Sequence, residues 1–137
     1  MHVIFVEPGF PNNQREFVRA LSSAGAFVTG IGERPLEFLD DELREWLGAY
    51  EQVSSVVHEP SLHEAVRRIQ ERGWVDRLEA TIEAHIQPTA NVREACGIPG
   101  TSTKTAFLCR DKPAMKEALR NADIPCAMSM GTSSMEE

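Results

Sequence analysis

The chain has 137 residues, of which 42% are hydrophobic and 26% are charged, and its formal net charge is −7. This length suits one domain with its own core, and the composition is ordinary for a soluble globular protein. The acidic balance argues against nucleic acid or an anionic membrane surface as the main partner. No apolar run approaches the length needed to span a bilayer.

The cysteines and the N-terminus indicate a reducing compartment. Cys96, Cys109 and Cys126 are odd in number and lack the close paired spacing of a zinc site or a disulfide framework. Residues 1–7 lack the basic start and the cleavage site of a signal peptide, and they fit a buried first strand better. We therefore expect a cytoplasmic protein.

The first thirty residues predict a β–α–β unit. Residues 3–6 are β-branched and aromatic, as in a strand buried on both faces, and a Pro-Gly-Phe-Pro run then ends the strand. Asn12 or Asn13 can cap a helix that Gly25 ends, and residues 26–31 form a second, parallel strand through a right-handed crossover. The expected apolar side of this helix consists of Phe17, Val18, Ala20, Leu21 and Ala24.

Two further helices and a third strand follow. Asp40 can cap a helix whose apolar residues recur at helical spacing up to Tyr50, and residues 53–57 form the strand. Ser61 and Glu64 fit the capping box of the next helix. The expected apolar positions are Leu43, Trp46, Leu47 and Tyr50 in the first helix and Leu62, Ala65, Val66 and Ile69 in the second.

The fourth strand, residues 75–82, is interrupted by polar side chains and has the least convincing composition of the four. A helix opened by Pro88 or Thr89 then runs to Ala95, because proline fits the first turn of a helix. The alternation of strands and helices indicates an α/β fold, doubly wound, with about four parallel strands and flanking helices.

Residues 97–125 predict a turn, a short helix, a longer helix and an extended exit. The Gly-Ile-Pro-Gly turn cannot continue a helix, and Thr101, Ser102 or Thr103 can cap a new one that runs to Leu108. Asp111 can cap the second helix, which Ile124 and Pro125 end. A buried stripe is expected along the second helix, at Met115, Ala118, Leu119 and Ala122.

The order of these features, Gly-Ile-Pro-Gly, a helix, Arg-Asp-Lys, Met-Lys and Ile-Pro, resembles the entry into the ATP-grasp fold. It is most similar to the carbamoyl-phosphate synthase and biotin carboxylase branch. The resemblance implies a Rossmann-like preATP-grasp domain at residues 1–98 and a helical lead-in at 99–127 to an ATP-grasp domain that is otherwise absent. Residues 128–137 are expected to form a disordered tail. Asp123 stands where the family often has glycine, the residue that most easily adopts a left-handed helix cap.

The resemblance also implies a function. ATP-grasp ligases use ATP and magnesium to activate a carboxylate as an acyl phosphate, which an amine or another nucleophile then attacks. The partner of the complete enzyme would be a small-molecule carboxylate, and a homo-oligomer is compatible with this interpretation. The lobes that hold the metal-binding acids lie outside this chain. We therefore expect the chain alone to be inactive and to bind no cofactor tightly.

Two site residues follow from the resemblance, Lys112 for ATP and Glu83 for the substrate. Lys112 falls where the family places a basic residue on an ATP phosphate, and an ammonium group suits a phosphate oxygen. The alternative is a solvent-exposed lysine in the first turn of a helix. Glu83 matches a glutamate after the fourth strand, near the substrate end of the sheet, and its alternative is a solvated acid. No catalytic residue is recognised.

The remaining candidates lie beyond the carboxyl ends of the strands, where open α/β sheets bind ligands. They are residues 7–14, 32–34, 58–59 and 83–85. The first of these loops has a single glycine and lacks the dinucleotide fingerprint, although its two asparagine amides can meet a small anion.

His58 and His63 lack a third ligand at a suitable spacing, so we expect no metal site. A second hypothesis for the whole chain is a non-catalytic flavodoxin-like or Rossmann-like module for small-ligand binding or assembly.

Overall fold

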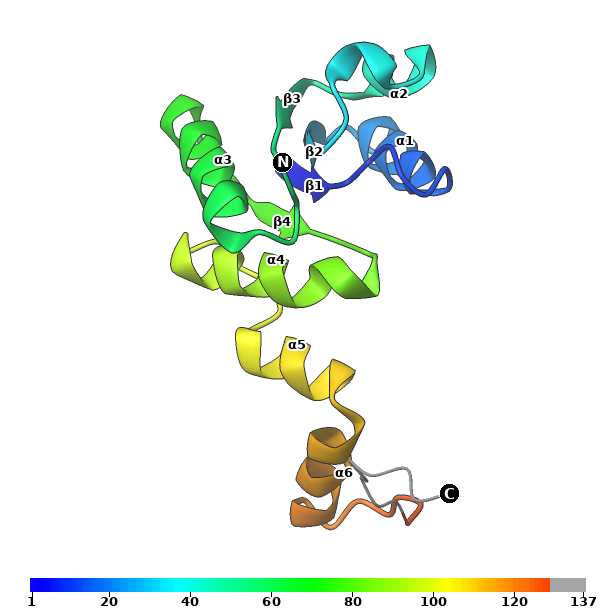
Figure 1. The fold of residues 1–137 in the computed structure, drawn as a ribbon, viewed down its shortest axis with the longest axis vertical. Coiled ribbons are helices and arrows are strands. Elements are labelled where there is room, and N and C mark those ends of the chain that lie inside the picture. The colour runs from blue at the N-terminus through cyan, green and yellow to red at the C-terminus, as the bar shows by residue number, and fades with distance from the viewer. Residues whose placement is uncertain (129–137) are drawn as a thin grey trace.

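The computed structural model describes residues 1–128. A 3₁₀ turn at Leu36–Phe38 lies between the second strand and the second helix. In chain order the strands and helices are β1 (His2–Val6), α1 (Gln14–Ser23), β2 (Phe27–Gly32), α2 (Asp41–Trp46), β3 (Ala49–Gln52), α3 (Glu59–Arg72), β4 (Arg77–Glu79), α4 (Glu83–Ala95), α5 (Thr103–Arg110) and α6 (Lys112–Asn121) (Figure 1). None of these helices is long and apolar enough to cross a membrane.

The four strands form one parallel sheet in the order β3-β2-β1-β4, which confirms the predicted Rossmann-like α/β fold. Side chains alternate across β1, as the pleat of a strand requires. Ile4 and Val6 face the core formed with α3 and α4, whereas Phe5 faces the core formed with α1 and α2. The sheet is therefore covered by helices on both faces, which explains its nearly continuous apolar first strand.

The third strand differs from its predicted position. It comprises Ala49–Gln52, and residues 53–57 lie in the loop that follows. Because α2 ends at Trp46, Leu47 and Tyr50 reach the same apolar core from extended chain rather than from a helix. The helical spacing of these residues was therefore coincidental, since Leu47 lies in the extended chain before β3 and Tyr50 lies within it.

Two predicted helix starts are also wrong. The helix α3 begins at Glu59, so Ser61 lies within its first turn, and the Ser61 hydroxyl interacts with Nδ1 of His58 instead of capping the helix. The helix α4 begins at Glu83 and continues through Pro88. Packing holds this helix together despite the missing N–H, because Thr89, Ala90 and Val92 are fully buried immediately afterwards.

The buried side of α1 is narrower than predicted. Val18 is fully buried and Leu21 is half-buried, whereas Phe17, Ala20 and Ala24 are exposed. The Phe17 ring stacks on the Phe5 ring with centroids 5.8 Å apart. Asp40 caps α2 as predicted, because its carboxylate accepts a hydrogen bond from the Leu43 amide at 2.8 Å.

A buried arginine joins the sheet to the helical lead-in. Arg93 on α4 donates to the carbonyl oxygen of Leu78 through Nε at 2.8 Å and to that of Thr101 through Nη1 at 2.8 Å. It also pairs with Glu79 at 2.9 Å. A Cβ at Gly100 would lie 2.6 Å from Cδ of Arg93, so the glycine leaves room for this side chain.

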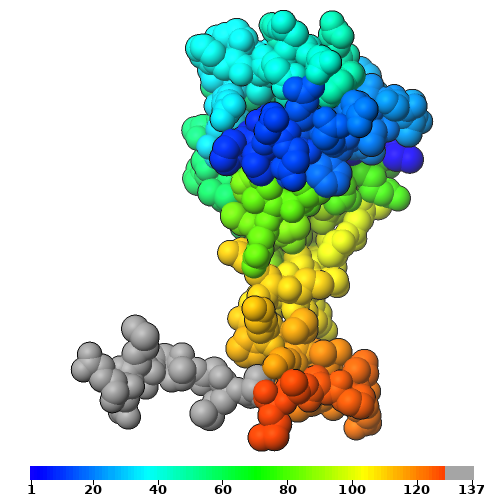
Figure 2. All heavy atoms as spheres, turned by 90° about the vertical axis from the view of Figure 1, so that its right-hand side faces the viewer, coloured from blue at the N-terminus to red at the C-terminus, as the bar shows by residue number. Residues whose placement is uncertain are grey.

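The helices α5 and α6 form the predicted hairpin, which projects from the sheet and its covering helices (Figure 2). Both predicted caps are present, since Ser102 Oγ accepts from the Thr105 amide at 3.1 Å and Asp111 Oδ1 accepts from the Ala114 amide at 2.8 Å. The first helix ends at Arg110, two residues later than predicted.

The predicted apolar stripe of α6 is not buried among the described residues. Met115, Ala118 and Leu119 are half-buried and Ala122 is exposed, because the projecting hairpin has little beside it to pack against. Asp123 has a φ of 55°, so a left-handed cap is present here although the residue is not glycine. The predicted tail lies outside the described residues, except for Met128.

Candidate ligand pocket at the strand ends

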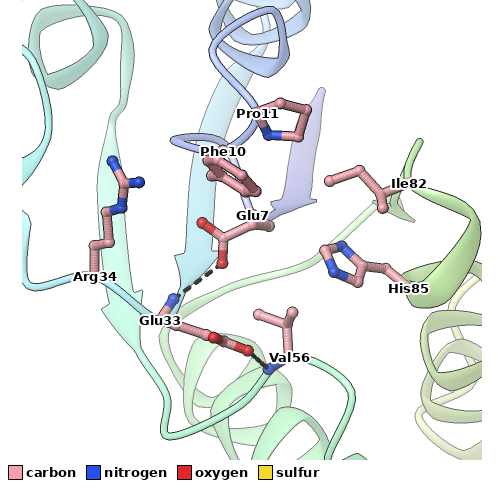
Figure 3. A pocket seen from close by; sticks show the side chains of 8 residues that line it. All are labelled: Glu7, Phe10, Pro11, Glu33, Arg34, Val56, Ile82 and His85. Carbon is pink, nitrogen blue, oxygen red and sulfur yellow. Dashed lines mark hydrogen bonds between the residues drawn. The ribbon is translucent and has the colours of Figure 1, made fainter.

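A pocket of about 330 Å³ lies at the carboxyl ends of the parallel strands (Figure 3). Its walls come from the loop after β1, the end of β2, the loop after β3 and the start of α4. Four chain segments that are distant in sequence therefore meet here, as the topology of an open parallel sheet requires. The lining residues are Glu7, Phe10, Pro11, Glu33, Arg34, Val56, Ile82 and His85.

Glu7 is the most buried acid of the pocket, with 6% of its surface exposed. It follows β1 directly and has a φ of 55°, a conformation that costs energy for any residue except glycine. Its Oε2 accepts a hydrogen bond from the Glu33 amide at 3.1 Å. Burial raises the pKa of the Glu7 carboxyl, and the hydrogen bond from Glu33 partly opposes this rise.

Glu33 and Arg34 fix the neighbouring wall. Oε1 of Glu33 accepts a hydrogen bond from the Val56 amide at 2.9 Å, which holds the loop after β3 against the end of β2. The Arg34 guanidinium lies 5.5 Å from the centre of the Phe10 ring, a cation–π distance. The backbone carbonyl of Arg34 accepts a hydrogen bond from the Tyr50 hydroxyl at 2.6 Å, so the backbone of Arg34 is anchored to β3.

His85 closes the side of the pocket that α4 provides. Its Nδ1 is buried and has no hydrogen-bond partner among residues 1–128. Burial lowers the pKa of the imidazole, and the charge of Glu33 opposes this shift. The ring is therefore neutral at pH 7, and whichever ring nitrogen lacks the proton can accept a hydrogen bond.

The sequence-predicted site residues are not brought together. Glu83 is exposed at the first position of α4, while its neighbours Ile82 and His85 line the pocket. Lys112 is exposed at the first position of α6, on the projecting hairpin, and forms no ion pair with another described residue. The roles expected for Glu83 and Lys112 stay predictions.

The other strand-end candidates divide between the pocket and the surface. Residues 7, 10, 11, 33, 34 and 85 converge, whereas His58 and Glu59 do not line the pocket. Glu59 accepts a hydrogen bond from the Asn91 side chain at 2.7 Å. Asn13 is the N-cap residue of α1 and makes no side-chain cap hydrogen bond. No group of three potential metal-ligating side chains was found within residues 1–128.

Because the third strand was predicted at the wrong residues, one wall of the pocket was not foreseen. Val56 lies in the loop after β3, where sequence reasoning had expected the middle of a strand. The polar residues that follow Gln52 could have indicated this loop, since Ser54 and Ser55 are typical of a turn.

Two solved structures share this fold. Phosphoribosylglycinamide synthetase from Anaerococcus prevotii matches 89% of the chain with a TM-score of 0.70 and 14% sequence identity. An L-amino acid ligase from Bacillus licheniformis matches 90% of the chain with a TM-score of 0.71 and 16% identity. The chain spans 29% and 30% of the length of these two chains, respectively. At such identities the likeness concerns the fold. No family model and no curated protein matches the sequence.

Proposed function

We propose that this chain is the N-terminal portion of an ATP-grasp ligase, whose pocket at the strand ends contacts the substrate. The observation that carries the proposal is a strand-end pocket of charged groups on a fold shared with two ATP-grasp ligases. The motif order from Gly97 to Pro125 independently resembles the entry into the same superfamily. The carbamoyl-phosphate synthase and biotin carboxylase branch is the finer assignment that this motif favours.

The proposed reaction begins when a substrate carboxylate oxygen attacks the γ-phosphorus of ATP, which gives an acyl phosphate and ADP. A nucleophile such as an amine then attacks the acyl carbon, releases phosphate and loses a proton. In this scheme Lys112 holds a phosphate oxygen of ATP, Glu83 contacts substrate beside the pocket, and magnesium is held by residues outside this chain. The charge-assisted contact of Lys112 supplies binding rather than chemistry.

The test uses the natural protein that contains this chain. Purified protein is incubated with Mg-ATP, a panel of small carboxylates and hydroxylamine, which converts an acyl phosphate into a stable hydroxamate. We expect hydroxamate and ADP to form in equal amounts with at least one carboxylate. ADP formation without hydroxamate for every carboxylate would contradict the ligase proposal.

The 137-residue chain alone provides a second test. A single lysine cannot enclose a triphosphate with its magnesium, so we expect weak Mg-ATP binding and no turnover above a buffer blank. Micromolar or tighter affinity in a calorimetric titration would show that the chain is a complete nucleotide-binding module, as the non-catalytic hypothesis allows.

A further inference from the structure

The pocket offers hydrogen-bond acceptors that no described group uses. One carboxylate oxygen of Glu7, Oε2, accepts from the Glu33 amide, and the other, Oε1, accepts no hydrogen bond within residues 1–128. Nδ1 of His85 is buried without a partner. A carboxylate oxygen without a donor favours a charged one, so a ligand that brings N–H donors would gain a charge-assisted hydrogen bond from Glu7.

The charges of the pocket are distributed unevenly. Glu7 and Glu33 supply two carboxylates at the ends of β1 and β2, and the neutral ring of His85 adds none. Arg34 supplies one guanidinium, which lies over the Phe10 ring on the side away from His85 (Figure 3). The walls from the loop after β3 and from the residue before α4 are uncharged, at Val56 and Ile82. The pocket therefore has a net negative interior with one positive flank.

We propose that the pocket binds a small α-amino acid, with its ammonium group between Glu7 and His85 and its carboxylate beside Arg34. An ammonium group has three donors, enough for the free oxygen of Glu7 and the ring of His85. The apolar walls formed by Phe10, Val56 and Ile82 suit an aliphatic side chain. This inference rests on the proposed function for the reaction that follows binding, but the binding itself does not need the missing lobes.

Two other ligand classes fit the pocket less well. A lone anion would approach Arg34 but would also meet the carboxylates of Glu7 and Glu33, which repel it. A metal ion requires several ligating side chains, and no group of three with suitable geometry occurs in the described part of the chain. An ammonium group matches the two carboxylates without further ligands.

The experiment titrates the ¹⁵N-labelled 137-residue chain with three matched probes and follows its amide resonances by NMR. L-Valine carries both charges, its 2-hydroxy analogue lacks the ammonium group, and L-valinamide lacks the carboxylate. We expect L-valine to shift the amides of Glu7, Glu33, Val56 and His85 saturably at millimolar concentrations. The hydroxy acid should bind at least tenfold more weakly, about 1.4 kcal/mol, because its hydroxyl has a single donor and no positive charge to pair with Glu7. Equal binding of the hydroxy acid, or no saturable shift with L-valine, would overturn the proposal.

Variants locate the two charged contacts. Glu7→Gln should weaken L-valine binding at least tenfold, whereas Glu45→Gln, an exposed acid on α2, should leave it unchanged. Arg34→Met should weaken L-valine but not L-valinamide, since only the former has a carboxylate. An Arg34 variant that weakens both probes equally would refute the assigned orientation.

The two proposals fail separately. Hydroxamate formation together with equal binding of valine and its hydroxy analogue would leave the ligase role intact and refute the amino acid. Selective valine binding without any hydroxamate would support the amino acid proposal and contradict the ligase role.

Discussion

The Glu33 amide donates a hydrogen bond to Oε2 of Glu7 at 3.1 Å, so the ends of the two central strands are joined through a buried carboxylate. Glu7 also has a left-handed backbone conformation, and burial raises the pKa of its carboxyl. A buried charge and an unfavourable backbone conformation both destabilise the fold. Their coincidence at one residue of a pocket is typical of a functional position.

We expect Glu7→Gln to raise the melting temperature by a few degrees at pH 7. The amide oxygen of glutamine can still accept from Glu33, but the cost of burying a charge disappears. The pKa of Glu7 is higher in the folded protein than in the unfolded chain. The stability of the parent protein therefore falls as the pH rises from the ordinary pKa of a glutamate through the pKa of Glu7 in the folded state. The gain should therefore shrink towards pH 4. Calorimetric scans at both pH values check this, with Glu45→Gln as the control, and a lower melting temperature at pH 7 would contradict it.

Binding of L-valine should depend on pH through His85 and Glu7. The pKa of His85 is lowered by burial, so the imidazole gains a proton only below its ordinary range, and the protonated ring repels an ammonium group. The pKa of Glu7 is raised, so its carboxylate is lost earlier on acidification than that of an exposed glutamate. Affinity should therefore fall as the pH decreases from 7 towards 4. NMR titrations across this range test the expectation, and pH-independent affinity would disprove it.

Arg93→Met should cost about 2–4 kcal/mol of the free energy of unfolding. The substitution leaves the carbonyl oxygens of Leu78 and Thr101 without their buried donor and removes the partner of Glu79. Urea unfolding followed by circular dichroism measures the loss. Arg67→Met is the control, because Arg67 is exposed on α3, and its effect should stay within about 0.5 kcal/mol. Similar losses for the two variants would remove the stabilising role assigned to Arg93.

Asp123→Gly should stabilise the end of α6 by about 1 kcal/mol. The amides of Asp123 and Ile124 donate to the carbonyl oxygens of Arg120 and Leu119 at 3.1 and 2.9 Å, which is a Schellman cap with Asp123 at its left-handed position. Glycine adopts this conformation without the steric cost of a Cβ. Slower amide hydrogen exchange in α6 would show the gain. Ala122→Gly, one residue earlier and not left-handed, should give no gain.

Lys112→Ala in the natural protein that contains this chain should weaken nucleotide binding by roughly ten- to hundredfold, or about 1.5–3 kcal/mol. Stability should hardly change, because Lys112 is exposed and a lysine in the first turn is disfavoured by the helix dipole. Lys116→Ala, one turn further along α6, is the matched control. Equal nucleotide constants for the Lys112 variant and the parent, at fixed magnesium and ionic strength, would leave Lys112 as a solvated side chain.

The fold could be predicted where local chemistry and packing agree. The apolar run of β1, the buried positions of α3 and the caps at Asp40, Ser102 and Asp111 are each supported by a local interaction visible in the sequence. The third strand could not be placed, because Leu47 and Tyr50 are three residues apart, as on one face of a helix, although both reach the core from extended chain.

The sequence predicted at which edge of the sheet the site lies, but not which residues line it. Topology alone places the residues after β1, β2 and β4 near one another. Which of them turn inward depends on long-range pairs such as Glu33 with Val56, and nothing local in the sequence encodes such a pair. Glu83 and His85 illustrate the limit, since two residues of one helical turn face solvent and pocket, respectively.

The contact of Arg93 with Thr101 has a mechanical consequence for the hairpin. The guanidinium ties Thr101 to strand β4, and the Thr103 amide donates to Glu94 on α4 at 3.0 Å, so the Gly-Ile-Pro-Gly turn and the start of α5 move with the sheet. We infer that the fulcrum for any rotation of α6 lies at Arg110 and Asp111, between the two helices. Amide exchange should be faster in α6 than in α5 or at Gly97. A fulcrum closer to α6 shortens the lever arm, so Lys112 sweeps a smaller arc for each degree of swing.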